Sequence, residues 1–203
     1  MSQPQIPVRN KLSVPLPPLL PRLEFEPPAR TVIEGVADAA EAIERLEAAG
    51  RAIEACKLAA HALPKREAVW WACMCARAAP DPQVMPEALA LDLKALEAAE
   101  AWVRRPEEAL RRAAMAAAEK ANYRSTEAWA AVGAFWSGGS MAPEGQPVVP
   151  PGEHLTGVAV GGAVVLAGVR LRPQETEARL RRFLASARDI ALGGAGRMPV
   201  EKP

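Results

Sequence analysis

Histidine and cysteine are the residue types in this chain best suited to metal binding, and both are few. The 203 residues include two histidines, His61 and His154, and three cysteines. Neither histidine has a second ligand three or four positions away. Cys56 and His61 are five positions apart, which separates them by about 140° around a helix. The spacing therefore predicts no metal site, and we expect no bound cofactor.

Serine and histidine together suggest a hydrolase, with serine as the nucleophile and histidine as its general base. Ser137, Ser140 and His154 are the candidates. The sequence around them has no Gly-x-Ser-x-Gly turn, and it lacks the alternating strands and helices that would support one. We therefore expect no catalytic residue and a protein that is not an enzyme. A small hydrolase using Ser140 and His154 is kept as the alternative.

The cysteines do not fit a disulfide framework. Three cysteines cannot all pair, and Cys73 and Cys75 point about 200° apart if they lie on one helix. Residues 1–22 also lack the basic start and apolar run of a secretory signal, because prolines interrupt them. The expected location is the cytoplasm.

Two glycine clusters, at 137–140 and 193–196, have a composition that phosphate-binding loops share. Both follow the predicted C-terminal ends of helices, where the helix dipole is negative. Phosphate sites use the positive N-terminal end instead. We interpret both clusters as turns that terminate helices.

The composition favours helices over sheets. Hydrophobic residues make up 50% of the chain and aromatic residues 4%, and alanine supplies a large part of the hydrophobic fraction. The formal net charge is +1, so no global field attracts nucleic acid or an anionic membrane. We predict an all-α protein, a compact bundle of about seven or eight helices, that binds no nucleic acid.

An N-terminal arm precedes the predicted bundle. Residues 1–30 contain eight of the twenty prolines, which favour extended backbone. We predict three regions: an extended proline-rich arm at 1–30, a helical domain at 31–197 and a tail at 198–203. The arm's apolar side chains need a cover, either a protein partner or the arm's own helices. The candidate partner contacts in the arm are Leu19, Leu20, Leu23 and Phe25.

Capping residues and prolines mark the predicted helices. Thr31 and Glu34 have the spacing of a capping box, which starts the first helix, and Gly50 ends it. Residues 69–76 are apolar without interruption, so the helix around them should be the most buried. Further helices are expected at about 51–63, 64–79, 86–105, 106–122, 126–137, 155–169 and 173–192.

The segment at 155–169 carries no charge. Its 15 residues are fewer than the roughly 20 that a membrane span requires. We therefore expect no membrane span. A buried helix is the first interpretation, and the four glycines keep a pair of short strands as the alternative.

Five tryptophans are the most unusual feature of the composition. At helical spacing tryptophans usually belong to a core. Trp70 and Trp71 are about 100° apart around a helix, so one narrow apolar stripe cannot hold both. Trp70 and Trp71 are therefore both candidate partner contacts, and one of them is expected to line a groove.

Charge is distributed unevenly along the chain. Residues 31–55 hold six acidic and two basic residues, a net charge of −4, and residues 170–197 hold seven basic and three acidic residues, a net charge of +4. The acidic first helix and the basic last helix are suited to face each other, within one molecule or between copies. The second arrangement predicts a homo-oligomer, and Arg181 and Arg182 are its candidate contacts. A structural subunit of such an oligomer is a further alternative function.

Four sequence segments carry a resemblance: EAVWWAC at 67–73, WVRRP at 102–106, FWSGGS at 135–140 and RDIALGGAGR at 188–197. In these segments the chain resembles an uncharacterised family of bacterial helical proteins associated with type VI secretion gene neighbourhoods. The resemblance covers about residues 35–197. It implies a protein-binding accessory role, as an adaptor or chaperone for a secreted component, and it assigns no catalytic residue.

Overall fold

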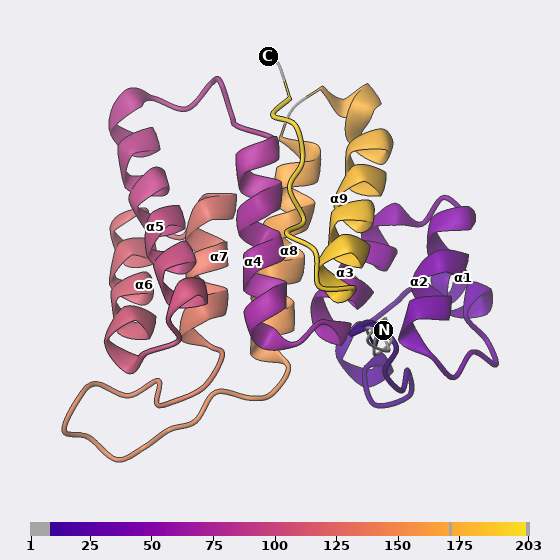
Figure 1. Ribbon diagram of the computed structural model, residues 1–203, viewed down its shortest axis with the longest axis horizontal. Coiled ribbons are helices and arrows are strands. Elements are labelled where there is room, and N and C mark those ends of the chain that lie inside the picture. The colour runs from indigo at the N-terminus through magenta and orange to yellow at the C-terminus, as the bar shows by residue number, and fades with distance from the viewer. Residues whose placement is uncertain (1–8, 171, 202–203) are drawn as a thin grey trace, which may run out of the picture.

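The computed structural model describes residues 9–170 and 172–201, and these residues form an all-α protein (Figure 1). Within this part of the chain there are nine α-helices, eight of them with seven residues or more, and no strand. The predicted bundle of seven or eight helices is confirmed. Residues 1–8 of the predicted arm and 202–203 of the predicted tail lie outside the described residues. Over the described ranges, no helix combines the length and the apolar character needed to cross a membrane.

The helices follow one another with short connections, except for a long loop before α8. Two short 3-10 helices, η1 (Leu20–Arg22) and η2 (Pro173–Glu175), precede α1 and α9. The α-helices are α1 (Pro27–Val32), α2 (Ala39–Ala48), α3 (Ala52–Ala62), α4 (Lys65–Ala78), α5 (Pro86–Arg104), α6 (Glu108–Lys120), α7 (Thr126–Phe135), α8 (Leu155–Val169) and α9 (Thr176–Ala191).

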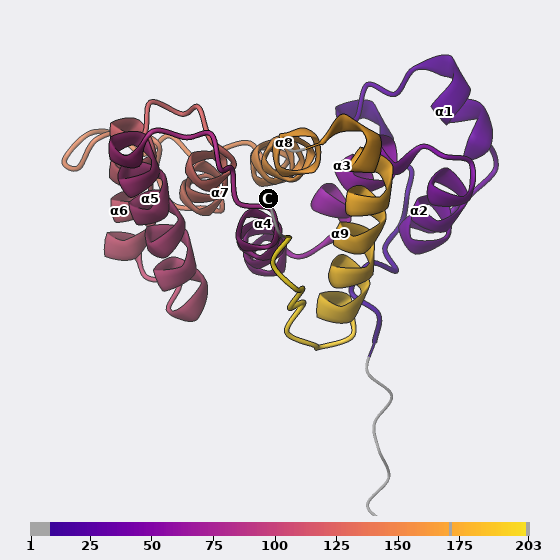
Figure 2. The ribbon, with the colours of Figure 1, turned by 90° about the horizontal axis from the view of Figure 1, so that it is seen from above.

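The helices lie side by side in an elongated row (Figures 1 and 2). Helices α5 and α6 form one end of the row, and α1 and α2 form the other. Helix α4 lies in the middle against α8. Nine of its fourteen residues are buried, because its apolar run faces neighbours on every side. The prediction of a central helix at 64–79 is confirmed, but the prediction that it is the most buried is wrong, since nine of the ten residues of α7 are buried.

Residues 155–169 form one helix, α8, and not a pair of strands. Its glycines permit close approach to neighbouring helices. A Cβ atom at Gly168 would lie 2.4 Å from Leu180 Cδ2, and one at Gly157 would lie 2.6 Å from His61 Cδ2. Small residues therefore replace the larger side chains that a helix in this position would otherwise carry.

The predicted first helix, from Thr31 to Gly50, is wrong at its start. Helix α1 ends at Val32, the chain turns at Gly35 with φ of 72°, and α2 begins after Asp38. Thr31 forms no capping box, because its hydroxyl donates back to Pro27 O at 3.1 Å. The carboxylate of Asp38 caps α2 instead, by accepting from the backbone N–H groups of residues 40 and 41. The predicted end at Gly50, with φ of 71°, is confirmed.

The described part of the arm packs against its own helices, and its backbone is not extended throughout. It contains turns and η1, and Leu12 and Leu16 are buried in the core. Backbone hydrogen bonds join it to two distant segments: Leu16 N donates to Ala37 O at 2.8 Å, and Lys11 N donates to Ala191 O at 3.1 Å. Of the two covers considered for the arm, the structure shows the arm's own domain.

Candidate partner-binding groove

A groove of about 790 Å³ lies between the first half of α5 and the last residues of α8. The C-terminal ends of α4 and α8 and the N-terminal end of α5 lie at the same end of the molecule, where the groove opens (Figure 1). Residues 80–84, between α4 and α5, form part of its rim. The groove is therefore built by the consecutive ends of α4 and α5, together with the N-terminal end of α7 and the C-terminal end of α8, which are distant in sequence.

One wall of the groove is an apolar stripe along α5. Met85, Leu89, Leu93 and Leu96 follow a spacing of four, four and three positions, so they lie on one face of the helix. Leu96 is 1% exposed, whereas Leu93, Leu89 and Met85 are 41%, 37% and 68% exposed. The stripe thus begins in the core and continues for about two turns beyond the part that the chain itself covers.

The opposite wall comes from α8 and from the C-terminal segment. Leu166, Val169 and Val200 contribute exposed apolar side chains. The segment that carries Val200 is fixed next to α4, since Glu201 N donates to Ala78 O at 2.7 Å. Glu201 also accepts from Arg179 at 2.6 Å and from Arg182 at 2.5 Å. Both walls are therefore held in place by contacts with the core.

A buried ion pair forms the floor of the groove. Arg170, the C-cap of α8, donates to both carboxylate oxygens of Glu127 at 3.0 Å. The same guanidinium donates to Ala79 O at 2.5 Å and to Ala76 O at 2.9 Å. It thereby satisfies carbonyl groups at the C-terminal end of α4 that lack partners within the helix. Arg170 joins α4, α7 and α8 at the groove.

Two polar groups in the groove have no partner among the described residues. Asp92 is 8% exposed and forms neither a side-chain hydrogen bond nor an ion pair within residues 9–170 and 172–201. Thr126 Oγ1 is buried without a hydrogen bond in the same part of the chain. An unpaired carboxylate against apolar surface is unfavourable unless a cation or N–H donor approaches it. The groove therefore offers apolar walls, an unpaired carboxylate at Asp92 and further charged residues of both signs, among them Asp81 and Arg124.

The sequence prediction located the apolar side of α5 but missed the groove. Leu89 and Leu93 are four positions apart, and this spacing predicts that they share one side of the helix at 86–105. Periodicity does not tell which part of a stripe a neighbouring helix covers. Met85, directly before the proline that starts α5, was the available signal, because it extends the stripe past the helix start.

The four arm residues predicted as partner contacts differ in how far they are buried. Leu23 and Phe25 are buried in the chain's own core, so the structure corrects their assignment as contacts. Each belongs to the cluster that also contains Ile33. Leu19 and Leu20 are partly buried against the same core and keep some exposed surface.

The two neighbouring tryptophans divide as their angular separation predicts. Trp71 is fully buried, and its indole N–H donates to Phe183 O at 2.8 Å. Trp70 is half-buried beside a shallow surface depression of about 320 Å³, and its N–H donates to Ala195 O at 2.9 Å. Trp71 is therefore a core residue, and the structure corrects its assignment as a partner contact. Trp70 keeps an exposed edge.

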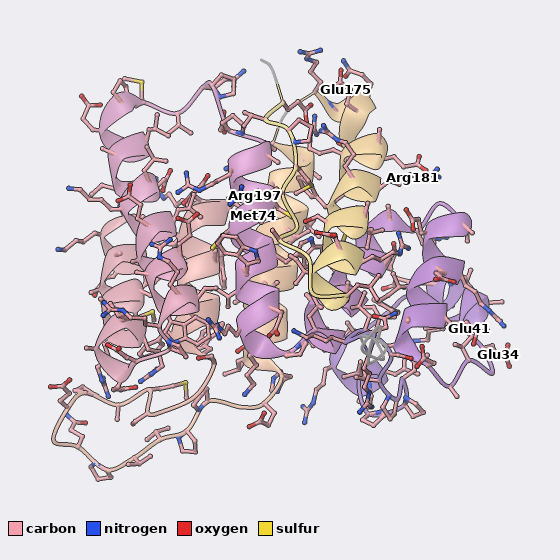
Figure 3. The ribbon with its side chains drawn as sticks, in the orientation of Figure 1. Glu34, Glu41, Met74, Glu175, Arg181 and Arg197 are labelled. Atoms are coloured by element: carbon pink, nitrogen blue, oxygen red, sulfur yellow. The ribbon has the colours of Figure 1, made fainter. Side chains whose placement is uncertain are left out.

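The basic last helix contacts the acidic helix α2 within the molecule. Arg188 of α9 forms an ion pair with Glu47 of α2. Arg181 is exposed on α9 and pairs with Glu177 at 2.7 Å (Figure 3). Arg182 pairs with Glu201 of the C-terminal segment. The intramolecular form of the predicted charge contact is present, and Arg181 is the exposed member of the two arginines proposed for contacts between copies.

Ser140 and His154, the alternative hydrolase pair, are not joined by a hydrogen bond in the described part of the chain. Ser140 Oγ accepts from Ala142 N and Val149 N at 3.1 Å. Its carbonyl accepts from the buried Arg111 at 2.7 Å. These contacts fix the loop before α8, and neither of the two to the hydroxyl is with a base that could activate it.

The cysteines are also poorly suited to nucleophilic chemistry. All three are buried and free, and burial raises the pKa of the Cys56, Cys73 and Cys75 thiols well above the usual value. The thiolate is the reactive form of cysteine, so these side chains are inert in the folded protein. Among residues 9–170 and 172–201 there is also no cluster of three or more metal-ligating side chains.

Comparison with known proteins gives one match. The model of a family described as "Family of unknown function (DUF6931)" matches residues 42–191. These residues include α3 to α9 and leave out the arm. No curated protein and no solved structure matches the chain.

Proposed function

We propose that this chain, which belongs to the family of unknown function DUF6931, is a non-enzymatic protein-binding accessory. In this proposal it acts as an adaptor or chaperone and holds one helix of its partner in the groove between α5 and α8. The resemblance to bacterial proteins from type VI secretion gene neighbourhoods supports a secreted component, or a part of the secretion machinery, as the partner.

The observation that carries the proposal is the concentration of exposed apolar side chains at one place. Six of the twelve large hydrophobic residues exposed among the described residues line this groove. Single exposed apolar residues are ordinary, but a contiguous group with a concave shape is typical of an interaction site. The six residues are Met85, Leu89, Leu93, Leu166, Val169 and Val200.

The shape of the groove favours a helix as the occupant. Its walls are helices, and the stripe from Met85 to Leu96 spans eleven positions, or about 16 Å. An amphipathic helix of about three turns matches that length and packs its own apolar ridge between two helices.

The unpaired carboxylate favours a positive charge on the occupant. Asp92 forms no ion pair among the described residues, although Arg77, Arg124 and Arg170 also line the groove. A lysine or arginine at the edge of the partner's apolar face would pair with Asp92 and remove the penalty of its burial. The proposed partner element is therefore an amphipathic helix with apolar residues about four positions apart and one basic residue beside them.

The test compares two variants with matched exposure. Leu89→Arg places a charge in the groove, and Ile53→Arg places the same charge on α3, where the side chain is equally exposed at 37%. Partners are captured from the source cells with wild-type protein, then purified, and their binding is measured by calorimetry. A synthetic peptide of the partner's helix is measured in the same way.

We expect Leu89→Arg to abolish binding of both partner and peptide, because an unpaired charge would enter an apolar interface. Ile53→Arg should bind as the wild type does. Equal binding by both variants would remove the groove from the proposal. Capture of a second copy of the chain in place of a different protein, confirmed by light scattering, would support the homo-oligomer alternative.

A further inference from the structure

A second cleft lies at the opposite end of α4 and α8 from the groove, and its walls combine apolar residues with several polar and charged ones. It encloses about 630 Å³ and is lined by the last residues of α3, the first residues of α4 and α8, and part of the arm. Helices α4 and α8 run parallel, so both of their N-terminal ends lie at this cleft (Figure 1). We call it the N-terminal cleft.

Neither helix N-terminus at this cleft is capped by a side chain. Pro64 and His154 occupy the N-cap positions of α4 and α8, and neither makes a side-chain capping hydrogen bond. The backbone N–H groups of Lys65, Thr156 and Gly157 have no acceptor within the described chain. Two parallel helix dipoles therefore end at one place with their positive ends exposed.

Two cationic side chains add to this field. Arg22 comes from the end of η1, lines the cleft and forms no ion pair within the described residues. Lys65 lines the cleft too and pairs with Glu153 at 2.8 Å. Glu153 is 91% exposed, so solvent screens its charge and it offsets the positive potential of the helix N-termini only weakly. The balance of charge at the cleft favours an anion.

Two buried polar atoms narrow the choice of anion. Thr156 is 1% exposed, lines the cleft, and its hydroxyl has no hydrogen-bond partner. His61 Nε2 is likewise buried without a partner. His61 Nδ1 lies 2.9 Å from Lys57 O, which accepts, so Nδ1 carries the proton. Burial lowers the pKa of His61, so the ring is neutral and Nε2 is an acceptor.

The lining of the cleft thus contains unsatisfied donors, at Thr156 and the helix ends, together with one unsatisfied acceptor at His61. A carboxylate or sulfate accepts hydrogen bonds but donates none. A phosphate group that retains one proton does both, since its P–OH donates and its other oxygens accept. We propose that the N-terminal cleft binds a phosphate group, free or as the monoester of a small molecule, with Arg22 and Lys65 neutralising its charge.

The arm contributes a charged side chain, Arg22, to the cleft in addition to its packing against the core. Arg22 is exposed, whereas its neighbour Leu23 is buried in the core. The buried leucine fixes the arm at the cleft and leaves the guanidinium free to reach an anion. This inference is independent of the proposed partner groove, because the two sites share no lining residue.

The first experiment titrates the ¹⁵N-labelled full-length protein with potassium phosphate, potassium sulfate, phosphoserine and glycerol 3-phosphate at constant ionic strength. We expect saturable shifts of the Lys65, Thr156 and Gly157 amide signals with phosphate or its monoesters, and binding of sulfate at least about tenfold weaker, the value of one hydrogen bond to a charged group. Saturation by the monoesters alone would identify an esterified ligand. Equal, unsaturated shifts with sulfate and with every phosphate compound would overturn the proposal.

Variants then test the residues. Arg22→Gln and Lys65→Gln should each weaken phosphate binding about tenfold, and Arg45→Gln, on the exposed face of α2, should leave it unchanged. Thr156→Val removes the hydroxyl and keeps the shape, so it should weaken binding without lowering the melting temperature of the unliganded protein. Thr156→Ser should restore binding. Phosphate affinity that is the same in all these variants would refute the assignment.

Discussion

The ion pair between Arg170 and Glu127 at the floor of the groove gives the sharpest test of how the bundle is held together. Arg170→Ala would remove five hydrogen bonds, three to Glu127 and two to carbonyls of α4. It would leave the Glu127 carboxylate, with its side chain 9% exposed, without a cation. Removing one partner of a buried pair destabilises a protein by about 3–5 kcal/mol.

That loss should be visible in urea unfolding. With a slope of about 2–3 kcal/mol per molar urea, the midpoint of Arg170→Ala should fall by about 1–2 M. Glu127→Gln should cost less, because an amide still accepts from the guanidinium. The double variant Glu127→Leu/Arg170→Met should recover part of the Arg170→Ala loss, since no charge stays buried. A midpoint for Arg170→Ala within about 0.3 M of the wild type would show that solvent already screens the pair.

Three further outcomes follow from burial and charge. Leu96→Ala should destabilise the protein by about 2–5 kcal/mol, whereas Leu89→Ala, from the exposed part of the same stripe, should cost under about 1 kcal/mol, as thermal unfolding will show. Cys73→Asp should prevent stable folding, because its site is apolar on all sides, and a near-native circular dichroism melt would contradict that burial. Hydrogen bonds from Arg179 lower the pKa of Glu201 to about 2. The ionised Glu201 carboxylate therefore contributes its full stabilisation above about pH 4.5, and this contribution is lost as the pH falls toward 2. Glu201→Gln should flatten the acid limb of a plot of stability against pH, and an unchanged limb would refute the contact.

Helix boundaries could be predicted wherever a single residue determines them. Ser125 caps α7 by accepting from Ala128 N, Pro86 starts α5, and Gly193 follows the end of α9 with φ of 91°. Thr31 was the predicted cap, whereas Asp38 caps α2 in the structure, and both residue types are good N-caps. The choice between them depended on the arm, because Ala39 N donates to Val14 O. That contact joins segments 25 positions apart, and local patterns do not contain it.

The candidate groove could be predicted only in part for the same reason. The spacing of Leu89 and Leu93 identifies the apolar face of α5. Of the leucines on this face, only Leu96 is buried in the core, whereas Leu93 and Leu89 are exposed. Which turns are covered depends on the lengths of α4 and α8 and on the loop at 79–85 that carries the chain between α4 and α5. Likewise, opposite net charges predicted a contact between the acidic and basic helices, but not that Glu47 and Arg188 would form it.

The carbonyl groups at the C-terminal end of α4 are satisfied by residues that are synthesised much later. Arg170 donates to the carbonyls of residues 76 and 79, and Glu201 N donates to that of residue 78. The C-terminal end of α4 therefore gains these hydrogen bonds only after about 90 to 120 further residues have been synthesised. At a translation rate of roughly 5–20 residues per second, that interval lasts several seconds or more. During it, the apolar surface of α4 is without α8 and α9 and is open to ribosome-associated chaperones. Helices α8 and α9 therefore complete the fold around the central helix only after α4 has been synthesised.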